Sequence, residues 1–219
     1  MSVIVLPKSL PSETDFDHLI EKYKSFRLLS LQLSPEAFGS TYAREVAFPD
    51  ETWRSRVSNP LATNIVASST KSSPSFHSEL DQIASDLILQ DDWLASLTLI
   101  GPLDKEDAAK RFQDMYLSPE IVLDGDAKWR FALNAMYVLP TARGGGLGVK
   151  LVEHAKTVAS ELASGEKARI LLVVDYENEG ARRTYEKSGF EVIQRHWFDD
   201  YRQGRGARTE AAVMKVDID

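Results

Sequence analysis

The sequence has no cysteine, only four histidines, no long apolar run and no excess of basic residues. Without cysteine, a disulfide framework, a thiolate nucleophile and a cysteine-based zinc site are all excluded. The histidines are His18, His77, His154 and His196, and their spacing is not that of metal ligands. We therefore expect no bound metal.

The charge balance narrows the possible partners. The chain has 33 acidic and 26 basic residues, which gives a formal net charge of −7. This charge argues against a nucleic-acid binder and favours small cationic partners. The opening segment MSVIVLP is too short for a membrane span or a signal peptide. We expect a soluble cytoplasmic protein with no membrane partner, either a monomer or a homodimer.

The length of 219 residues and the 43% hydrophobic content predict one domain over residues 1–219. Apolar periodicity predicts its elements. Helices are expected at 15–33, from a start at Ser34–Pro35, in a short turn capped by Asp50, and at 76–90, 104–116, 149–162 and 179–188; strands are expected at 2–6, 62–68, 93–100, 129–140, 169–175, 190–197 and 211–218. Strands that alternate with helices in this way predict an α/β fold.

Glycine is concentrated in the segment RGGGLG, Arg143–Gly148, between a predicted strand and a predicted helix. Glycine at such a junction lets backbone N–H groups face an anion, and the helix N-terminus adds partial positive charge. A diphosphate is therefore the expected ligand, although a flexible surface turn is the simpler alternative. The Walker pattern fails because Val149 separates Gly148 from Lys150, and the pattern G-x-G-x-x-G fails at its last glycine.

The segment fits R-x-x-G-x-G, with Arg143, Gly146 and Gly148, and here the chain resembles the GNAT superfamily of acyl-CoA-dependent N-acyltransferases. The resemblance implies a mixed sheet of six to seven strands flanked by helices and splayed between the fourth and fifth strands. It also implies acetyl-CoA as co-substrate, with its pyrophosphate on the loop that comprises Arg143, Gly144, Gly145, Gly146, Leu147 and Gly148. The side chain of Arg143 either binds phosphate, which we favour, or covers the loop.

A second motif lies about 30 residues further on. In ENEGARRTYEKSGF, residues Asn178, Ala181 and Tyr185 fall on one helical face before Gly189, as in the signature N-x-x-A-x-x-x-Y-x-x-x-G-F of the same family. The resemblance implies that Tyr185 protonates the departing thiolate, that Asn178 and Ala181 belong to the cofactor site, and that the Val138 N–H polarises the thioester carbonyl. Tyr185 as a core aromatic and Asn178 as a simple N-cap are the alternatives.

The resemblance identifies neither the amine that accepts the acetyl group nor the base that deprotonates it. Residues 34–57 look like the first helices of amine-acetylating members, whereas residues 70–128 match poorly and predict an insertion. Many relatives place a glutamate on the fourth strand as the base, but Asn134 occupies that region here. Glu45, Asp199, His196 or water are the candidates for the base, and an amine that arrives neutral needs none.

The leading hypothesis is an N-acetyltransferase that transfers acetyl from acetyl-CoA to a primary amine of a small molecule or peptide, by direct attack in a ternary complex. A cysteine-based acyl-enzyme is excluded by composition. Two rivals remain: an enzyme that acetylates protein N-termini or lysines, and a noncatalytic protein that binds or senses CoA.

Overall fold

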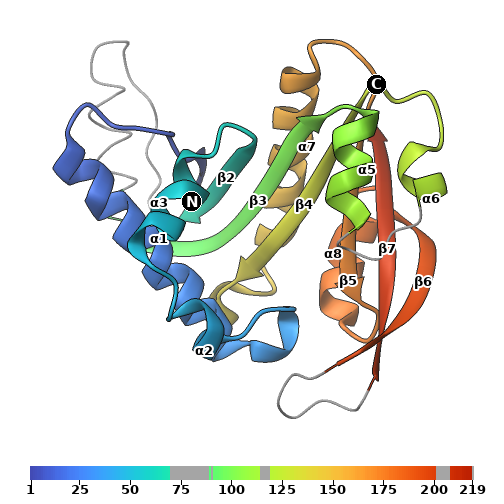
Figure 1. Ribbon diagram of the computed structural model, residues 1–219. Helices are drawn as coiled ribbons and strands as arrows, with labels where there is room; N and C mark the ends of the chain where they lie inside the picture. Colours follow the sequence, from blue (N-terminus) through green and yellow to red (C-terminus); the bar gives the residue numbers. More distant parts are fainter. Residues whose placement is uncertain (70–88, 90, 114–118, 201–207, 219) are drawn as a thin grey trace. The chain divides into compact units, whose positions relative to one another are not determined.

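The computed structural model describes residues 1–69, 89, 91–113, 119–200 and 208–218 (Figure 1). The elements in chain order are β1 (Ser2–Val5), α1 (Glu13–Leu33), the 3₁₀ helix η1 (Pro35–Ala37), α2 (Tyr42–Glu45), α3 (Asp50–Ser58), β2 (Ala62–Ser68), β3 (Trp93–Leu103), α5 (Lys105–Gln113), α6 (Pro119–Leu123), β4 (Trp129–Val138), η2 (Pro140–Ala142), α7 (Leu147–Ala163), β5 (Ala168–Asp175), α8 (Glu179–Lys187), β6 (Glu191–Asp199) and β7 (Arg208–Ile218). The chain divides into two compact units, which are residues 1–97 with 135–151, and residues 98–134 with 152–219.

The strands form a seven-stranded mixed sheet in the order β1-β2-β3-β4-β5-β7-β6. The central pair β4–β5 is parallel, and its register runs from Trp129 opposite Ala168 to Ala132 opposite Leu171. By contrast, β5 pairs antiparallel with β7 along the whole of β5. The pairing of β4 with β5 therefore ends before the carboxyl ends of both strands, in agreement with the fold class predicted from the sequence.

Helix α1 packs against the aromatic-rich core of the first unit. The Ser12 side chain caps α1 by accepting from the Asp15 N–H at 3.2 Å, and the apolar face of the helix enters an aromatic-rich core. Phe26 of α1 packs edge-on against Trp93 and Tyr137, with ring centroids 5.9 Å and 6.2 Å apart. The buried members of this core are Leu6, Phe16, Leu19, Ile20, Phe26, Leu31, Phe38, Trp53, Val57, Val66, Trp93 and Tyr137. Burial of this apolar surface is the main force that holds α1 and α3 on their strands.

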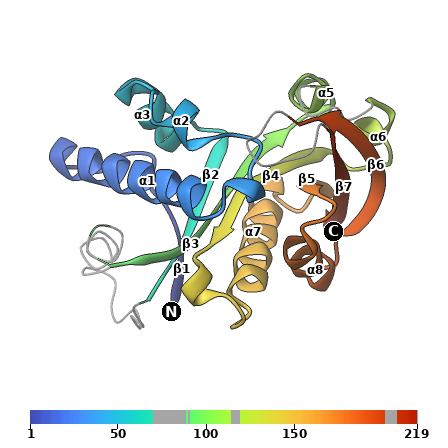
Figure 2. The same cartoon turned by 90° about the horizontal axis from the view of Figure 1, so that it is seen from below.

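In the second unit, α5 and α6 lie on one face of the strands β5, β7 and β6, and α7 and α8 lie on the other (Figures 1 and 2). Side chains of β5 and β7 alternate between the faces, as the pleat of a strand requires. Leu171 and Val213 pack in one cluster with Ala108 and Phe112 of α5 and Val122 of α6. Helices on both faces explain why RILLVVD is almost continuously apolar.

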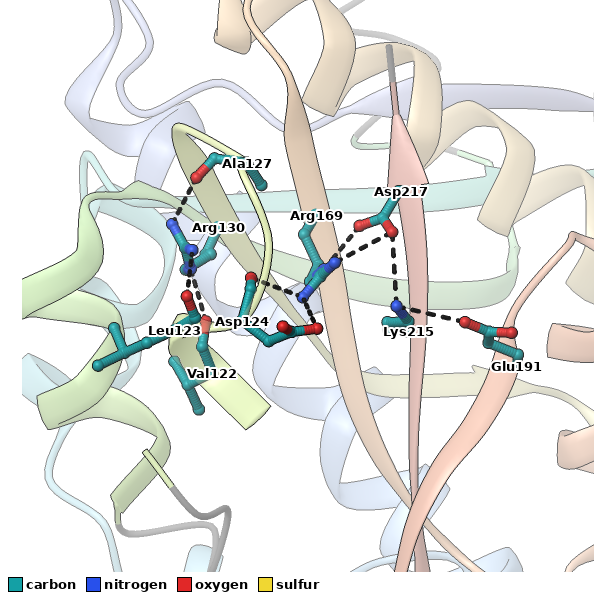
Figure 3. A network of polar contacts seen from close by, with 9 residues as sticks. All are labelled: Val122, Leu123, Asp124, Ala127, Arg130, Arg169, Glu191, Lys215 and Asp217. Carbon is teal, nitrogen blue, oxygen red and sulfur yellow. Dashed lines mark hydrogen bonds and ion pairs between the residues drawn. The ribbon is translucent and has the colours of Figure 1, made fainter. Parts of the chain in front are cut away.

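Two buried arginines lie side by side on β4 and β5 within the second unit (Figure 3). Arg130, 0% exposed, donates to the carbonyl oxygens of Val122 at 2.6 Å, Ala127 at 2.8 Å and Leu123 at 3.5 Å. It thereby satisfies carbonyls at the end of α6 that have no partner within the helix. Burial, followed by the charge of Arg169, lowers the pKa of Arg130.

Arg169 is held by a carboxylate instead. Its Nε and Nη2 donate to the two oxygens of Asp217 at 2.6 Å and 3.1 Å, and its Nη1 donates to the carbonyl of Asp124 at 2.9 Å. Hydrogen bonding from Arg169 lowers the pKa of Asp217 despite its partial burial. The Lys215 ammonium, 3.6 Å from Asp217 and 3.3 Å from Glu191, extends the network to β6 (Figure 3).

Most predicted elements are confirmed, and two local predictions in the first unit are wrong. The helix expected from Ser34–Pro35 is only the short η1, because Phe38 adopts an extended backbone and is buried in the aromatic core. Asp50 does not cap α3: Pro49 is the N-cap residue, and the Asp50 carboxylate accepts from Lys24 of α1 at 2.9 Å. The helix expected at 76–90 lies almost wholly outside the described residues, as does the end of the helix expected at 104–116.

Candidate active site

The glycine-rich loop that follows β4 adopts a conformation that requires glycine. Gly144 has φ +86° and Gly146 has φ +75°, in the left-handed region that other residues rarely adopt. A Cβ at Gly144, Gly145 or Gly146 would meet no atom within 4 Å. The loop backbone therefore borders open space, as close approach of a ligand requires.

The loop leads directly into the N-terminus of α7. Leu147 begins the helix and is 2% exposed, and the Lys150 N–H makes an early helical bond, to the Gly146 carbonyl at 3.1 Å. The amides of the first helical turn have no carbonyl of their own helix to bond. The first turn of α7 has no acidic residue. This arrangement favours an anion beside the loop.

Val138 ends β4 just before the loop. Ala135, earlier on the same strand, has φ +52°, which is unusual for a residue with a side chain. The backbone of β4 thus departs from regular strand geometry three residues before Val138. The Val138 carbonyl accepts from Arg143 Nε at 3.0 Å, so these two predicted site residues are in direct contact.

Helix α8 carries the second motif. Asn178 is its N-cap residue, and its Oδ1 accepts from the Ala181 N–H at 3.1 Å. Tyr185 is 6% exposed and packs against Phe190, with ring centroids 5.7 Å apart. Gly189 ends the helix at φ +86°, as the motif predicts. Burial raises the pKa of Tyr185 well above its usual range, so the phenol keeps its proton at neutral pH.

The three candidate bases have different surroundings. Glu45 is buried in the first unit, where Arg27 and Arg56 donate to its carboxylate. Burial alone would raise its pKa, but the bonds and charge of Arg27, with further bonds from Arg56 and Ser40, lower it to about 2. A carboxylate of such low basicity is a poor proton acceptor.

The other two candidates belong to β6. Asp199 is exposed, with Oδ1 3.8 Å from Arg208 Nε. His196 is half-buried, and burial lowers its pKa, which favours the neutral imidazole at pH 7. Neutral imidazole is the form that accepts a proton.

The predicted site residues fall in both units. Val138, Arg143, the loop glycines and Glu45 belong to the first, and Asn178, Ala181, Tyr185, His196 and Asp199 belong to the second. Sequence reasoning missed a contact of the loop: Arg143 Nη2 donates to Ser34 Oγ at 3.1 Å. No periodicity or motif links residues so far apart in sequence.

The described part of the chain has neither a cluster of metal-binding side chains nor a membrane-spanning helix. It holds no group of three or more His, Cys, Asp or Glu side chains placed to bind a metal ion. Among the same residues, no helix is long and apolar enough to cross a membrane.

Comparison with solved structures identifies the class of fold. Arabidopsis thaliana NAA60 in complex with a bisubstrate analogue superimposes with a TM-score of 0.59 at 16% identity, covering 100% of this chain and 99% of that chain. Spermidine N-acetyltransferase from Vibrio cholerae, in complex with CoA and spermine, gives a TM-score of 0.54 at 13% identity, covering 98% and 94%. At these identities the likeness establishes the fold, which is that of N-acetyltransferases.

Sequence comparison matches part of the chain to a family. Residues 109–190 match the family model described as Acetyltransferase (GNAT) family. Peptidyl-lysine N-acetyltransferase YjaB of Escherichia coli is 38% identical over 68 residues, which are 31% of this chain and 41% of that protein. The match thus spans less than half of that relative. Residues 109–190, which include both sequence motifs, thus match the GNAT family in sequence, and the chain has the fold of N-acetyltransferases, in agreement with the resemblance that the two motifs carry.

Proposed function

We propose that the protein is an N-acetyltransferase that moves the acetyl group of acetyl-CoA to a primary amine. The observation that carries this proposal is the loop from Arg143 to Gly148, whose left-handed glycines leave the backbone beside α7 uncovered. The loop amides and the helix N-terminus suit the CoA pyrophosphate. Acetyl-CoA is also present in a solved structure of Arabidopsis thaliana NAA60, which has a TM-score of 0.58.

Direct transfer needs three contributions from this chain. The Val138 N–H donates to the thioester oxygen, on which negative charge develops as the amine nitrogen attacks the carbonyl carbon. The carbon–sulfur bond then breaks, and the neutral phenol of Tyr185 gives its proton to the leaving sulfur. Asn178 caps α8 and thereby orients the helix that carries Tyr185. The attacking nitrogen loses its proton to water or to a base such as His196.

Small amines and peptide amines are both accepted by proteins similar to this one. A spermidine N-acetyltransferase shares the fold, and the curated relative acts on peptidyl lysine. Because this relative matches 31% of the chain at 38% identity, protein lysine acetylation is the second candidate function. The net charge of −7 favours cationic acceptors of either kind.

The test is release of free thiol from acetyl-CoA in the presence of a polyamine, a lysine peptide or a peptide with a free N-terminus. Mass spectrometry of the acceptor identifies the acetylated product. Turnover with polyamines but not peptides supports the small-molecule function, and the reverse supports the protein-directed one. CoA binding without turnover on any amine would refute catalysis and leave the sensing function.

A further inference from the structure

The guanidinium of Arg143 is engaged by groups of the protein itself. Its Nε donates to the Val138 carbonyl at 3.0 Å, its Nη2 donates to Ser34 Oγ at 3.1 Å, and the group lies over the Tyr137 ring at 5.6 Å from the centroid. These contacts all lie within the first unit. An arginine that served only as a phosphate ligand would need none of them.

The contact with Val138 helps to fix one peptide group at both ends. The peptide that joins Val138 to Leu139 presents its carbonyl to Arg143, and its N–H donates to the Leu94 carbonyl at 2.9 Å. The backbone at Val138 cannot rotate without the loss of one of these bonds. The direction of the adjacent Val138 N–H, the proposed donor to the thioester, is therefore set partly by Arg143.

The contact with Ser34 ties the same loop to the end of α1. Ser34 is 2% exposed; its N–H donates to the Ser30 carbonyl and its own carbonyl accepts from Ala37, both at 3.0 Å. It is thus a rigid junction between α1 and η1. In both ribbon views this end of α1 lies beside the end of β4 (Figures 1 and 2). The Ser34 hydroxyl makes no capping bond to η1 and accepts from Arg143 instead.

We infer that Arg143 is a positioning residue, and that Ser34 is its anchor: the pair aims the Val138 N–H at the thioester and couples the acetyl-CoA loop to the α1–η1 junction. This inference rests on the proposed function. A charge-assisted hydrogen bond contributes more than a neutral one, and a misdirected oxyanion donor lowers the rate of the chemical step. Binding of the pyrophosphate depends on the loop amides, which Arg143 does not replace.

The experiment compares acetyl-CoA with acetyl-pantetheine, which lacks the phosphates, in the parent and in Arg143→Ala, Ser34→Ala and the double variant. Arg143→Ala is expected to lower kcat about 10- to 100-fold with both donors, because loss of a hydrogen bond to a charged group costs that factor. KM for acetyl-CoA should change by no more than about threefold. Ser34→Ala should show a smaller fall, and the double variant should be no worse than Arg143→Ala alone.

Arg44→Ala, at an exposed arginine of α2, is the matched control and should leave both constants unchanged. Thermal unfolding of each variant verifies that the protein is folded. If Arg143→Ala weakens binding of acetyl-CoA and leaves acetyl-pantetheine unaffected, Arg143 is a phosphate ligand and the inference is overturned. If the falls in kcat of the two single variants multiply in the double variant, Ser34 does not act through Arg143 and its role as anchor is overturned.

An infrared measurement keeps the inference testable if no amine is turned over. The carbonyl stretch of carbon-13 acetyl-CoA should move to lower frequency on binding to the parent, because the Val138 N–H polarises it. That shift should be reduced in Arg143→Ala at saturating ligand. An identical shift in both proteins would refute the positioning role even if the protein proves to be noncatalytic.

Discussion

Replacing Glu45 with glutamine removes the negative charge that Arg27 and Arg56 share inside the first unit. Arg27 donates to both carboxylate oxygens, at 2.7 Å and 3.1 Å, and Arg56 donates at 2.7 Å. The Glu45 side chain is 2% exposed, so water cannot substitute for the lost charge. A glutamine NH₂ would also face arginine N–H donors. We expect Glu45→Gln to destabilise the folded protein strongly.

The pKa of Glu45 sets the scale of this effect. A fall from 4.5 to about 2 on folding corresponds to about 3 kcal/mol, at roughly 1.4 kcal/mol per pKa unit. Because the folded-state pKa is the lower one, this stabilisation is fully present above the unfolded-state pKa of 4.5 and disappears as the pH falls through about 2. At pH 3.5 about 2 kcal/mol should remain.

The assay is urea unfolding of the parent and Glu45→Gln at pH 7 and at pH 3.5. The difference in unfolding free energy should be about 3 kcal/mol at pH 7 and smaller by about 1 kcal/mol at pH 3.5. Glu51→Gln, at an exposed glutamate of α3, should differ from the parent by less than about 0.5 kcal/mol at both pH values. A Glu45→Gln difference that is independent of pH would refute the charge argument.

Three other substitutions test the remaining structure. Tyr185→Phe should lower single-turnover acetyl transfer by about 10²-fold with little change in CoA affinity, and unchanged transfer would leave water as the proton donor. Gly146→Ala should weaken CoA binding more than Gly145→Ala, measured by calorimetry, because Gly146, unlike Gly145, has a left-handed φ; equal affinities would exclude a conformational role for Gly146. Arg130→Met should lower the free energy of unfolding, measured in urea, by at least about 2 kcal/mol, because it leaves buried carbonyls without a hydrogen-bond donor. Lys128→Met, at an exposed lysine of the same region, is the control and should lower it far less. Equal losses in the two variants would contradict this account.

The sequence was most informative where local pattern and tertiary environment agree. The continuous apolar run of β5 reflects helices on both faces, and the spacing of Asn178, Ala181 and Tyr185 reflects one face of α8. The glycine positions followed from backbone sterics, which depend on a few adjacent residues. These features carry the resemblance to the GNAT family and define the proposed cofactor loop.

Predictions from the sequence were wrong where a side chain bonds to a residue far away in the chain. Ser34 and Asp50 have the chemistry of capping residues, but the hydroxyl of Ser34 accepts from Arg143 and the carboxylate of Asp50 accepts from Lys24. Glu45 was a candidate base by residue type alone, and only the folded chain brings Arg27 and Arg56 to its carboxylate. Such pairings depend on tertiary structure that periodicity does not encode.

Ala135, with its left-handed φ, lies where β4 passes from one compact unit to the other. The boundary between the two compact units falls between Asn134 and Ala135, so the strand is shared by two separately packed groups. Ala132 is buried in the cluster that includes residues of α5, whereas Tyr137 is buried against Phe26 of α1 and Phe38, which follows η1. Amide hydrogens in the two halves of this single strand should therefore exchange through different opening reactions, each with the free energy of its own unit.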